Sequence, residues 1–178
     1  MRRAARRMLV LSWALLLTSA CTGSAPHART SPSPSPSASE SPSSLDKLLT
    51  QQHNEVFDVS RRFVIALTTY DAASLREDER RVLALATDGF YDQYKKLIAP
   101  PFNQAVTELR ASSRGSIISL TVPPVVGLHA TVIAVVLVTA SIRTQRTPRV
   151  DTQHLELGLV QTSTGWKVAH LTVLSRYA

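Results

Sequence analysis

The feature that most constrains the fold is a long alternation of apolar residues between Leu128 and Ile142. Every even-numbered position in it is apolar, whereas the odd-numbered positions are mixed and turn polar near the ends. Because successive side chains of a strand point to opposite faces, this period of two predicts a strand with one face in the core and the other partly wet.

Three more segments have strand character. Ile117 to Val122 stops at Pro123-Pro124, Val150 to Gln161 follows a polar loop, and Trp166 to Leu174 follows a Ser-Thr-Gly turn. Before Gly115 the apolar residues have helical spacing instead. Helices first and hairpin-connected strands afterwards predict an α+β fold, in which N-terminal helices pack on an antiparallel sheet of about four strands.

The helical half is predicted to contain four helices. The first begins near Ser44, and a capping-box pattern at Ser74–Glu77 opens the second. A third, around Phe90–Ile98, is ended by Pro100-Pro101, and Phe102–Ser112 forms the last. The apolar residues expected on one buried face of the first helix are Leu45, Leu48, Leu49, Val56, Phe57, Phe63, Val64, Leu67 and Tyr70.

The N-terminus has the layout of an export signal. Met1–Arg7 is basic, and Met8–Leu17 is an apolar run. A helix of that length would reach only about half of the ~30 Å hydrocarbon core of a membrane. Residues 1–20 are therefore predicted to be a signal peptide and not a lasting membrane span.

The stretch that follows, LTSAC, resembles a bacterial lipobox. In proteins with that motif the cysteine is lipidated, for example with palmitate, and cleavage in front of it makes it the new N-terminus. The resemblance implies that Cys21 is the lipidation site. Thr18 departs from the pattern, which prefers Leu there. Two alternatives stay open: ordinary secretion with cleavage near Ala20, or an uncleaved anchor.

The segment after Cys21 is rich in Ser and Pro, and residues 22–44 contain no Leu, Ile, Val, Phe or Tyr. It cannot bury enough apolar surface to offset the entropy of ordering it. Residues 21–44 are therefore predicted to form a lipidated, disordered linker. The remaining residues, 45–178, are enough for a single α+β domain with its own core.

The basic charge of the chain lies largely in the leader. The full sequence has 20 Lys+Arg against 13 Asp+Glu. Without Arg2, Arg3, Arg6 and Arg7 the balance falls to 16 against 13, a net charge of +3. No nucleic-acid partner is therefore expected. The single cysteine excludes an intramolecular disulfide and a multi-cysteine metal cluster.

Several stretches of the folded region resemble the Mce-associated proteins of actinobacteria, within the nuclear transport factor 2-like superfamily. They are LTTYD, RVLALATDGFYDQY, HATVIAVVLVTASI and GWKVAHLTVL, and the resemblance covers about Val56 to Leu174. It implies a curved antiparallel sheet wrapped around a long helix as a cone, and a role in or beside envelope lipid import or secretion-channel assembly. Many members have an N-terminal transmembrane helix, whereas this chain has a lipoprotein-like leader.

No catalytic motif is present: the sequence lacks GxSxG, HExxH, a P-loop and a Rossmann glycine run. The ionisable groups on the predicted sheet are His129, His154 and His170, with Asp151 and Glu156 near in sequence. A histidine and a carboxylate among them could form an acid-base pair, but we expect the histidines to lie at the surface or at the edge of the core. We therefore expect a non-enzymatic protein that has no cofactor and no metal.

Three aromatic residues are candidates for a ligand pocket. Trp166 opens the last strand, where it lines a pocket or plugs the end of the sheet. Tyr91 and Tyr94 form either a contact surface or a cover over the mouth of the cone.

Arg143, Arg146 and Arg149 lie in one loop with no acid between them. They are candidates for contact with an anionic surface, and the alternative is a solvated hairpin tip.

These features predict a lipid-anchored protein on the extracytoplasmic face of the cell membrane. Its cone-like domain is expected to scaffold or assist a membrane complex of the Mce lipid-import type, so its partners would be the membrane and envelope transport proteins. A lipid or small-molecule carrier that uses the cone cavity is one alternative, and a hydratase or isomerase is another. The interior of the cone distinguishes them, because a carrier needs an apolar cavity that opens to solvent.

Overall fold

The computed structural model describes residues 43–177. The predicted signal peptide, Cys21 and the linker up to residue 42 lie outside these described residues. Within residues 43–177, none of the helices combines the length and the apolar character that crossing a membrane requires.

The first helix, α1, spans Ser44–Thr68 and begins at a capping box. The Ser43 hydroxyl accepts a hydrogen bond from the Asp46 backbone N–H, and the Asp46 carboxylate accepts one from the Ser43 N–H, both at 3.1 Å. The Ser43 hydroxyl also donates to the Asp46 carboxylate at 2.7 Å, and this bond, together with the one from the Ser43 N–H, stabilises the ionised carboxylate and lowers the pKa of Asp46. The N-cap is therefore Ser43, one residue before the predicted one.

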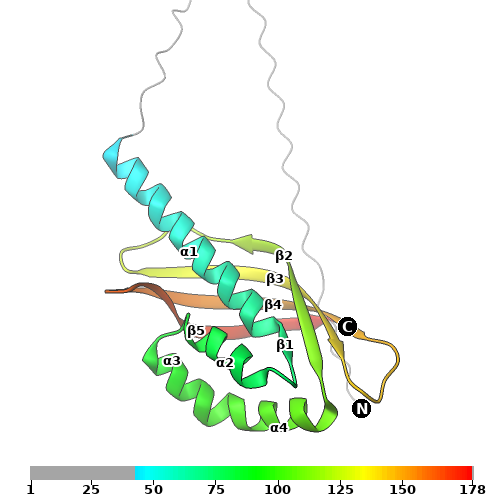
Figure 1. Cartoon of the computed structure of the whole chain (residues 1–178). Coiled ribbons are helices and arrows are strands. Elements are labelled where there is room, and N and C mark those ends of the chain that lie inside the picture. Colours follow the sequence, from blue (N-terminus) through cyan, green and yellow to red (C-terminus); the bar gives the residue numbers. More distant parts are fainter. Residues whose placement is uncertain (1–42, 178) are drawn as a thin grey trace, which may run out of the picture. The chain divides into compact units, whose positions relative to one another are not determined.

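Only the C-terminal half of α1 packs into the core. Its buried apolar residues are Val56, Val59, Phe63 and Val64. The prediction that Leu45, Leu48 and Leu49 share this burial is wrong, because they are 62%, 59% and 49% exposed. The helix continues past the edge of the sheet, so the leucines of its first turns stay largely in water (Figure 1).

Three α-helices and a π-helical turn follow: α2 (Leu75–Leu83), α3 (Asp88–Gln93), η1 (Tyr94–Ile98) and α4 (Ala99–Leu109). The prediction that Pro100-Pro101 ends a helix is wrong. The two prolines stand in the first turn of α4, where a residue without an N–H loses no hydrogen bond. The π-helical turn η1 links α3 directly to α4, with no loop between them.

Ser74 is the N-cap residue of α2, but the predicted capping box does not form. Its hydroxyl donates to the Asp78 carboxylate at 3.0 Å instead. The same carboxylate also accepts from the Asp71 backbone N–H at 2.8 Å, so Asp78 is the residue that organises this turn.

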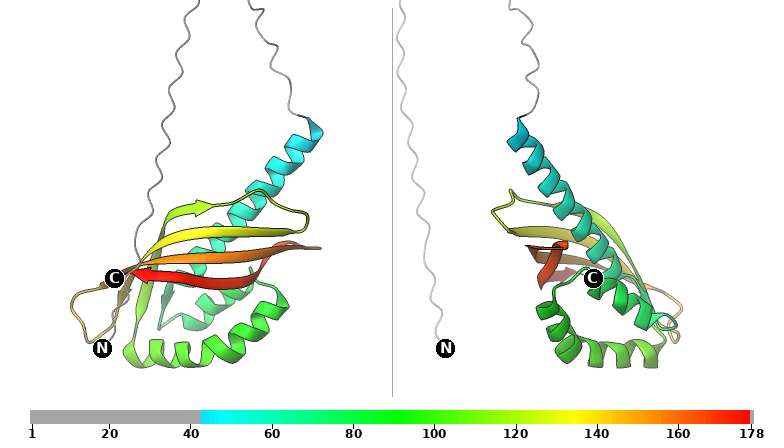
Figure 2. Two further views of the ribbon diagram at one scale, coloured as in Figure 1. Left: turned by 180° about the vertical axis from the view of Figure 1, so that it is seen from behind. Right: turned by 60° about the vertical axis from the view of Figure 1, so that its left-hand side comes forward.

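The sheet has five antiparallel strands in chain order, and all helices lie on one of its faces (Figure 2). The four long strands were predicted from the sequence. The fifth, β1, is only two residues long and was missed. The strands are β1 (Tyr70–Asp71), β2 (Ser112–Thr121), β3 (His129–Ser141), β4 (Arg149–Thr162) and β5 (Gly165–Tyr177).

The core lies between α1 and the inner face of the sheet. The even-numbered residues of β3 from Ala130 to Val138 are buried, as their alternation predicts. The first three of them pair in register with Leu159, Leu157 and Leu155 of β4. Phe63 of α1 reaches this layer and makes an edge contact with Phe90, with ring centroids 5.6 Å apart. The odd-numbered residues of β3 lie on the outer face of the sheet, opposite the helices.

Gly115 of β2 allows the end of α1 to lie directly on the sheet. A Cβ atom at this position would meet the Thr68 Oγ1 at 1.9 Å and the Thr68 Cβ at 2.6 Å. The Gly115 N–H donates to the Thr69 hydroxyl at 3.2 Å, and the neighbouring Ser113 hydroxyl donates to the Thr68 carbonyl at 2.9 Å. The glycine therefore sets how closely α1 approaches β2.

Candidate functional site

The cone contains a cavity of about 440 Å³ between the helices and the inner face of the sheet. Its wall is mostly aliphatic and aromatic, with a few polar groups from Thr68, Ser113, Gln153 and two tyrosines. The lining residues are Leu67, Thr68, Tyr70, Tyr94, Ile98, Phe102, Ser113, Val138, Gln153, Leu155, Leu171 and Val173. An apolar cavity with a few polar groups is the usual form of a small-molecule site.

The two tyrosines of this cavity stay protonated at neutral pH. Burial, together with the negative charge of Glu79, raises the pKa of Tyr94 to about 12. Burial also raises the pKa of Tyr70, whose ring packs edge-on against Phe102 at 4.9 Å. Both phenols can therefore donate a hydrogen bond to a polar group on a bound molecule.

Glu79 is the centre of a polar cluster beside Tyr94. It is 9% exposed, and its carboxylate forms an ion pair with the Lys95 ammonium at 2.7 Å. The Asn103 amide lies 3.5 Å from the other carboxylate oxygen. This cluster compensates the buried charge and fixes α2 to the helices after it.

The raised pKa of Tyr94 predicts an alkaline loss of stability. The unfolded phenol ionises near pH 10, whereas the folded one holds its proton to about pH 12. Its contribution is therefore fully present below pH 10 and is lost as the pH rises toward 12, by at most about 3 kcal/mol. Urea unfolding of wild type and Tyr94→Phe at pH 9, 10 and 11 should show the wild type losing more stability. Parallel curves for the two proteins would contradict this.

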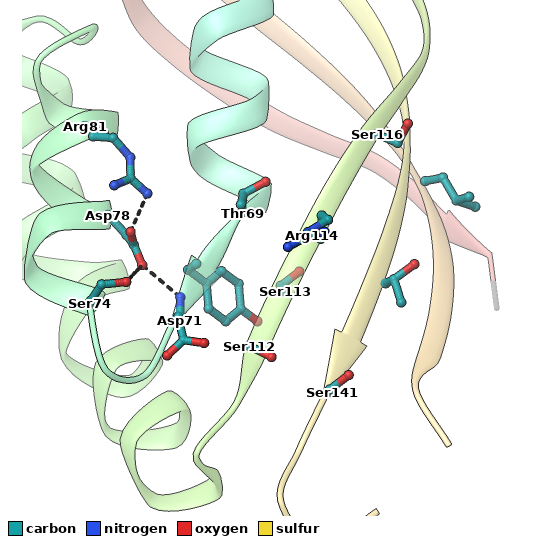
Figure 3. Close-up of a pocket in the computed structure, with 13 residues that line it drawn as sticks. Thr69, Asp71, Ser74, Asp78, Arg81, Ser112, Ser113, Arg114, Ser116 and Ser141 are labelled. Atoms are coloured by element: carbon teal, nitrogen blue, oxygen red, sulfur yellow. Dashed lines mark hydrogen bonds and ion pairs between the residues drawn. The ribbon is translucent and has the colours of Figure 1, made fainter. Parts of the chain in front are cut away.

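A second pocket, of about 570 Å³, lies where β1, β2 and β3 meet α2 (Figure 3). Its wall is polar, and eight of its residues carry hydroxyl groups. It also contains two arginines and two aspartates. The lining residues are Thr69, Tyr70, Asp71, Ser74, Asp78, Arg81, Ser112, Ser113, Arg114, Ser116, Leu137, Thr139 and Ser141. We call it the hydroxyl pocket.

One aspartate–arginine pair forms the α2 wall of the hydroxyl pocket. Asp78 is 3% exposed and forms an ion pair with Arg81, in addition to its bonds to Ser74 and Asp71. Figure 3 shows this chain of contacts running from Arg81 through Asp78 to the Asp71 N–H. The charges of Asp78 and Arg81 therefore offset each other, and the pair serves to hold β1 against α2.

The predicted aromatic candidates lie in three different environments. Tyr94 is 5% exposed and lines the cone cavity, stacked on Phe90. Trp166 is 3% exposed and belongs to the core, outside the cavity lining. Tyr91 is 45% exposed, and the Lys95 ammonium lies 5.9 Å from the centre of its ring. Only Tyr94 is placed to contact a molecule in the cone.

The three loop arginines are all exposed. Arg149 forms an ion pair with Asp151 at 2.9 Å, so one of the three charges is compensated locally. The backbone N–H of Arg143 donates to the Leu109 carbonyl, which ties the loop to the end of α4. Contact of Arg143 and Arg146 with an anionic surface stays a prediction.

The three histidines of the strands lie on the outer side of the sheet or at its end. His129 and His170 are exposed, and the His170 ring lies 3.0 Å from the Thr172 hydroxyl. His154 is half-buried and shares the outer face with Glu156, as their spacing predicts. Within residues 43–177, no group of three or more His, Cys, Asp or Glu side chains is arranged to hold a metal ion.

Sequence reasoning missed Arg114 and Tyr70 as site residues. Arg114 stands in a run of serines in β2, and only the register of β2 on β3 brings the other hydroxyls around it. The signal in the sequence was the polar residues at every second position, Ser112, Arg114 and Ser116, which give one polar face to a strand.

No family model matches the sequence, and no curated protein matches it. Solved structures do match. An IcmL-like type IV secretion system protein from Legionella pneumophila is 15% identical, with a TM-score of 0.58, over 72% of this chain and 93% of that one. The periplasmic domain of DotI is 16% identical, with a TM-score of 0.58, over 76% and 98%.

The same fold also occurs in a protein provisionally described as an aromatic ring hydroxylase, from Novosphingobium aromaticivorans. It is 14% identical, with a TM-score of 0.50, over 72% of this chain and 93% of that one. At such identities the likeness concerns the fold alone, so it does not separate a scaffold from an enzyme. The helices followed by a curled five-stranded antiparallel sheet place this chain in the nuclear transport factor 2-like fold.

Proposed function

We propose that this chain is a non-enzymatic, extracytoplasmic component of an envelope assembly, and that its cone-like domain acts as a scaffold. The observation that carries the proposal is the projecting end of α1. Leu45, Leu48 and Leu49 form an exposed apolar face, which we call the leucine face. Large apolar groups that gather on a projecting element mark an interaction site.

The surroundings of the leucine face favour a protein partner. A groove of about 330 Å³ lies next to it, lined by Leu49, Thr50, His53, Pro124 and Val125. Apolar residues at spacings of three and four on a helix are the pattern that docks against another helix. The first three turns carry one acid, Asp46, and one base, Lys47, and so have no basic excess, which argues against binding to an anionic membrane surface.

Two proteins of similar structure support a location in the cell envelope. One is named as a type IV secretion system protein and another as a periplasmic domain, both in the same fold. Anchoring through lipid on Cys21 rests on the lipobox resemblance, and an Mce-type lipid importer as the partner rests on the resemblance in sequence. The lipid anchor and the Mce-type partner are therefore parts of the proposal that the sequence alone supports.

The test replaces Leu45, Leu48 and Leu49 together with Ser. Each leucine leaves about half of its side chain in water, so a partner that covers all three gains roughly 1 kcal/mol from each. The triple variant should therefore associate about 100-fold more weakly with its envelope partners. Its domain should unfold at nearly the wild-type temperature, because these residues do not pack in the core.

A photo-crosslinking residue at Leu48 identifies the partner in cells, and the same residue at the exposed Arg61 of α1 is the matched control. Crosslinks from position 48 to envelope transport or secretion proteins, absent from position 61, would support the scaffold. Identical crosslinks from both positions, or unchanged partners of the triple variant, would contradict it.

The cone cavity favours a second candidate, a carrier of a small apolar molecule. Its aliphatic wall and the two protonated tyrosines suit a ligand with an apolar body and one polar end. Native mass spectrometry of the protein taken from its own cells separates the two functions. A carrier retains a bound apolar molecule, whereas a scaffold has the mass of the chain and its anchor.

A further inference from the structure

The hydroxyl pocket contains an arginine surrounded by hydroxyl groups. Arg114 lies on the outer face of β2, directly opposite Thr139 of β3. Ser112 and Ser116 are its neighbours on the same face of β2, and Ser141 is paired with Ser112. Side chains that stand opposite each other in an antiparallel pair have Cβ atoms about 5 Å apart. The guanidinium and the hydroxyls of Ser112, Thr139 and Ser141 can therefore converge on one ligand, whereas Ser116 lies farther along the strand.

Two charges in this pocket have no counter-charge. Among residues 43–177, neither Arg114 nor Asp71 forms an ion pair, whereas Arg81 is paired with Asp78. Asp71 is exposed, and one of its oxygens accepts a hydrogen bond from the Ala73 N–H. The pocket therefore offers one free cation and one free carboxylate.

The register fixes the spacing of these two charges. Asp71 of β1 stands opposite Ser112, so Arg114 is its diagonal neighbour across the β1–β2 pair. Diagonal neighbours have Cα atoms about 7–8 Å apart. Figure 3 shows Asp71 beside α2 and Arg114 on the neighbouring strand β2.

We propose that the hydroxyl pocket binds a small zwitterion that has an oxyanion at one end and a primary ammonium at the other. The oxyanion lies on Arg114 and accepts hydrogen bonds from Ser112 and Thr139. The ammonium lies on the carboxylate of Asp71. Phosphoethanolamine is the simplest compound with this chemistry, either free or as the headgroup of a phospholipid.

Other classes of ligand fit the charges less well. A simple anion would satisfy Arg114 but would be repelled by Asp71. A neutral polyol would use the hydroxyls and leave both charges unpaired. Only a ligand with both charges completes hydrogen bonds at both ends, and bonds to ionised groups are the strong ones.

Calorimetric titration of the full-length protein in detergent tests this with phosphoethanolamine, inorganic phosphate and ethanolamine. Phosphoethanolamine should bind about tenfold or more tightly than either half. Arg114→Gln should weaken it about tenfold. Asp71→Asn should also weaken it, but should leave phosphate binding equal or stronger, because the repelling carboxylate is gone.

Arg61→Gln, an exposed change elsewhere on the chain, is the matched control and should bind like wild type. Thr139→Val removes a hydroxyl without removing charge, and it replaces Arg114→Gln in the comparison if that variant does not fold. Phosphate binding as tightly as phosphoethanolamine, no binding of either, or wild-type affinity in the pocket variants would overturn the proposal.

Vesicles containing phosphatidylethanolamine identify the source of the ligand. Salt-resistant binding to them that Arg114→Gln and Asp71→Asn both abolish identifies a lipid headgroup. Binding of soluble phosphoethanolamine alone, with no binding to the vesicles, identifies a free or non-lipid ligand. The leucine face is not involved, so Leu45, Leu48 and Leu49 replaced by Ser should leave the titrations unchanged.

Discussion

Replacing Gly115 with alanine is expected to lower the free energy of unfolding by about 3 kcal/mol or more. The new Cβ would lie 1.9 Å from the Thr68 Oγ1 and 2.6 Å from its Cβ, so α1 and β2 would have to move apart. The loss of stability should exceed that of ordinary overpacking. The Thr68 Cβ is fixed to the backbone of α1, so a change of rotamer cannot move it away. Urea unfolding followed by circular dichroism measures it.

Two further variants separate this clash from a general effect of removing a glycine. Gly89→Ala is the matched control, since nothing lies within 4 Å of its added Cβ, and it should unfold almost like wild type. Combining Gly115→Ala with Thr68→Gly removes both clashing atoms and should restore part of the loss. Equal stability of Gly115→Ala and Gly89→Ala would mean that α1 does not lie as close to β2 as described.

Asp78→Ala is expected to cost about 2–3 kcal/mol. Its carboxylate accepts hydrogen bonds from the Asp71 N–H and the Ser74 hydroxyl and pairs with Arg81, while 3% of the residue is exposed. The variant leaves these donors without an acceptor in a place that little water reaches. Thermal and urea unfolding should both show the loss, and β1 should lose its protection from hydrogen exchange first.

The matched control for this change is Asp92→Ala, because Asp92 is exposed on α3. It should change the stability by only a few tenths of a kcal/mol. Asp78→Asn keeps one acceptor oxygen and should fall between the two. If Asp78→Ala and Asp92→Ala had the same free energy of unfolding, the buried carboxylate would not be what holds β1 to α2.

The sequence predicted the fold correctly wherever the apolar residues of a segment followed one clear spacing. The alternation around Val132 and Val136 predicted β3 and its buried face, because a strand has only two faces. The leucine face was misjudged for a related reason. Helical spacing at Leu45 and Leu48 shows that apolar residues share a face, but it cannot show where the helix leaves the body it packs on. Strand β1 is too short to have a period at all.

The candidate sites depended more on register than on composition. Tyr94 could be proposed for the cone cavity from its aromatic neighbours, but nothing local distinguished it from the buried Trp166. Arg114 became a candidate only when β2 was aligned with β3, since Thr139 and Ser141 are far from it in the chain. Association with Mce proteins and lipidation of Cys21 stay predictions.

The position of α1 before every strand of the domain has a consequence for biosynthesis. A ribosome makes α1 before the strands that bury Val56, Phe63 and Val64, and Val168 of the same core follows only in β5. Until β5 exists, the apolar stripe of α1 has no native partner and is open to aggregation. A chaperone or translocation factor that covers this helix in the nascent chain would therefore raise the yield of folded protein, and shortening the delay before β3–β5 emerge would reduce the need for it.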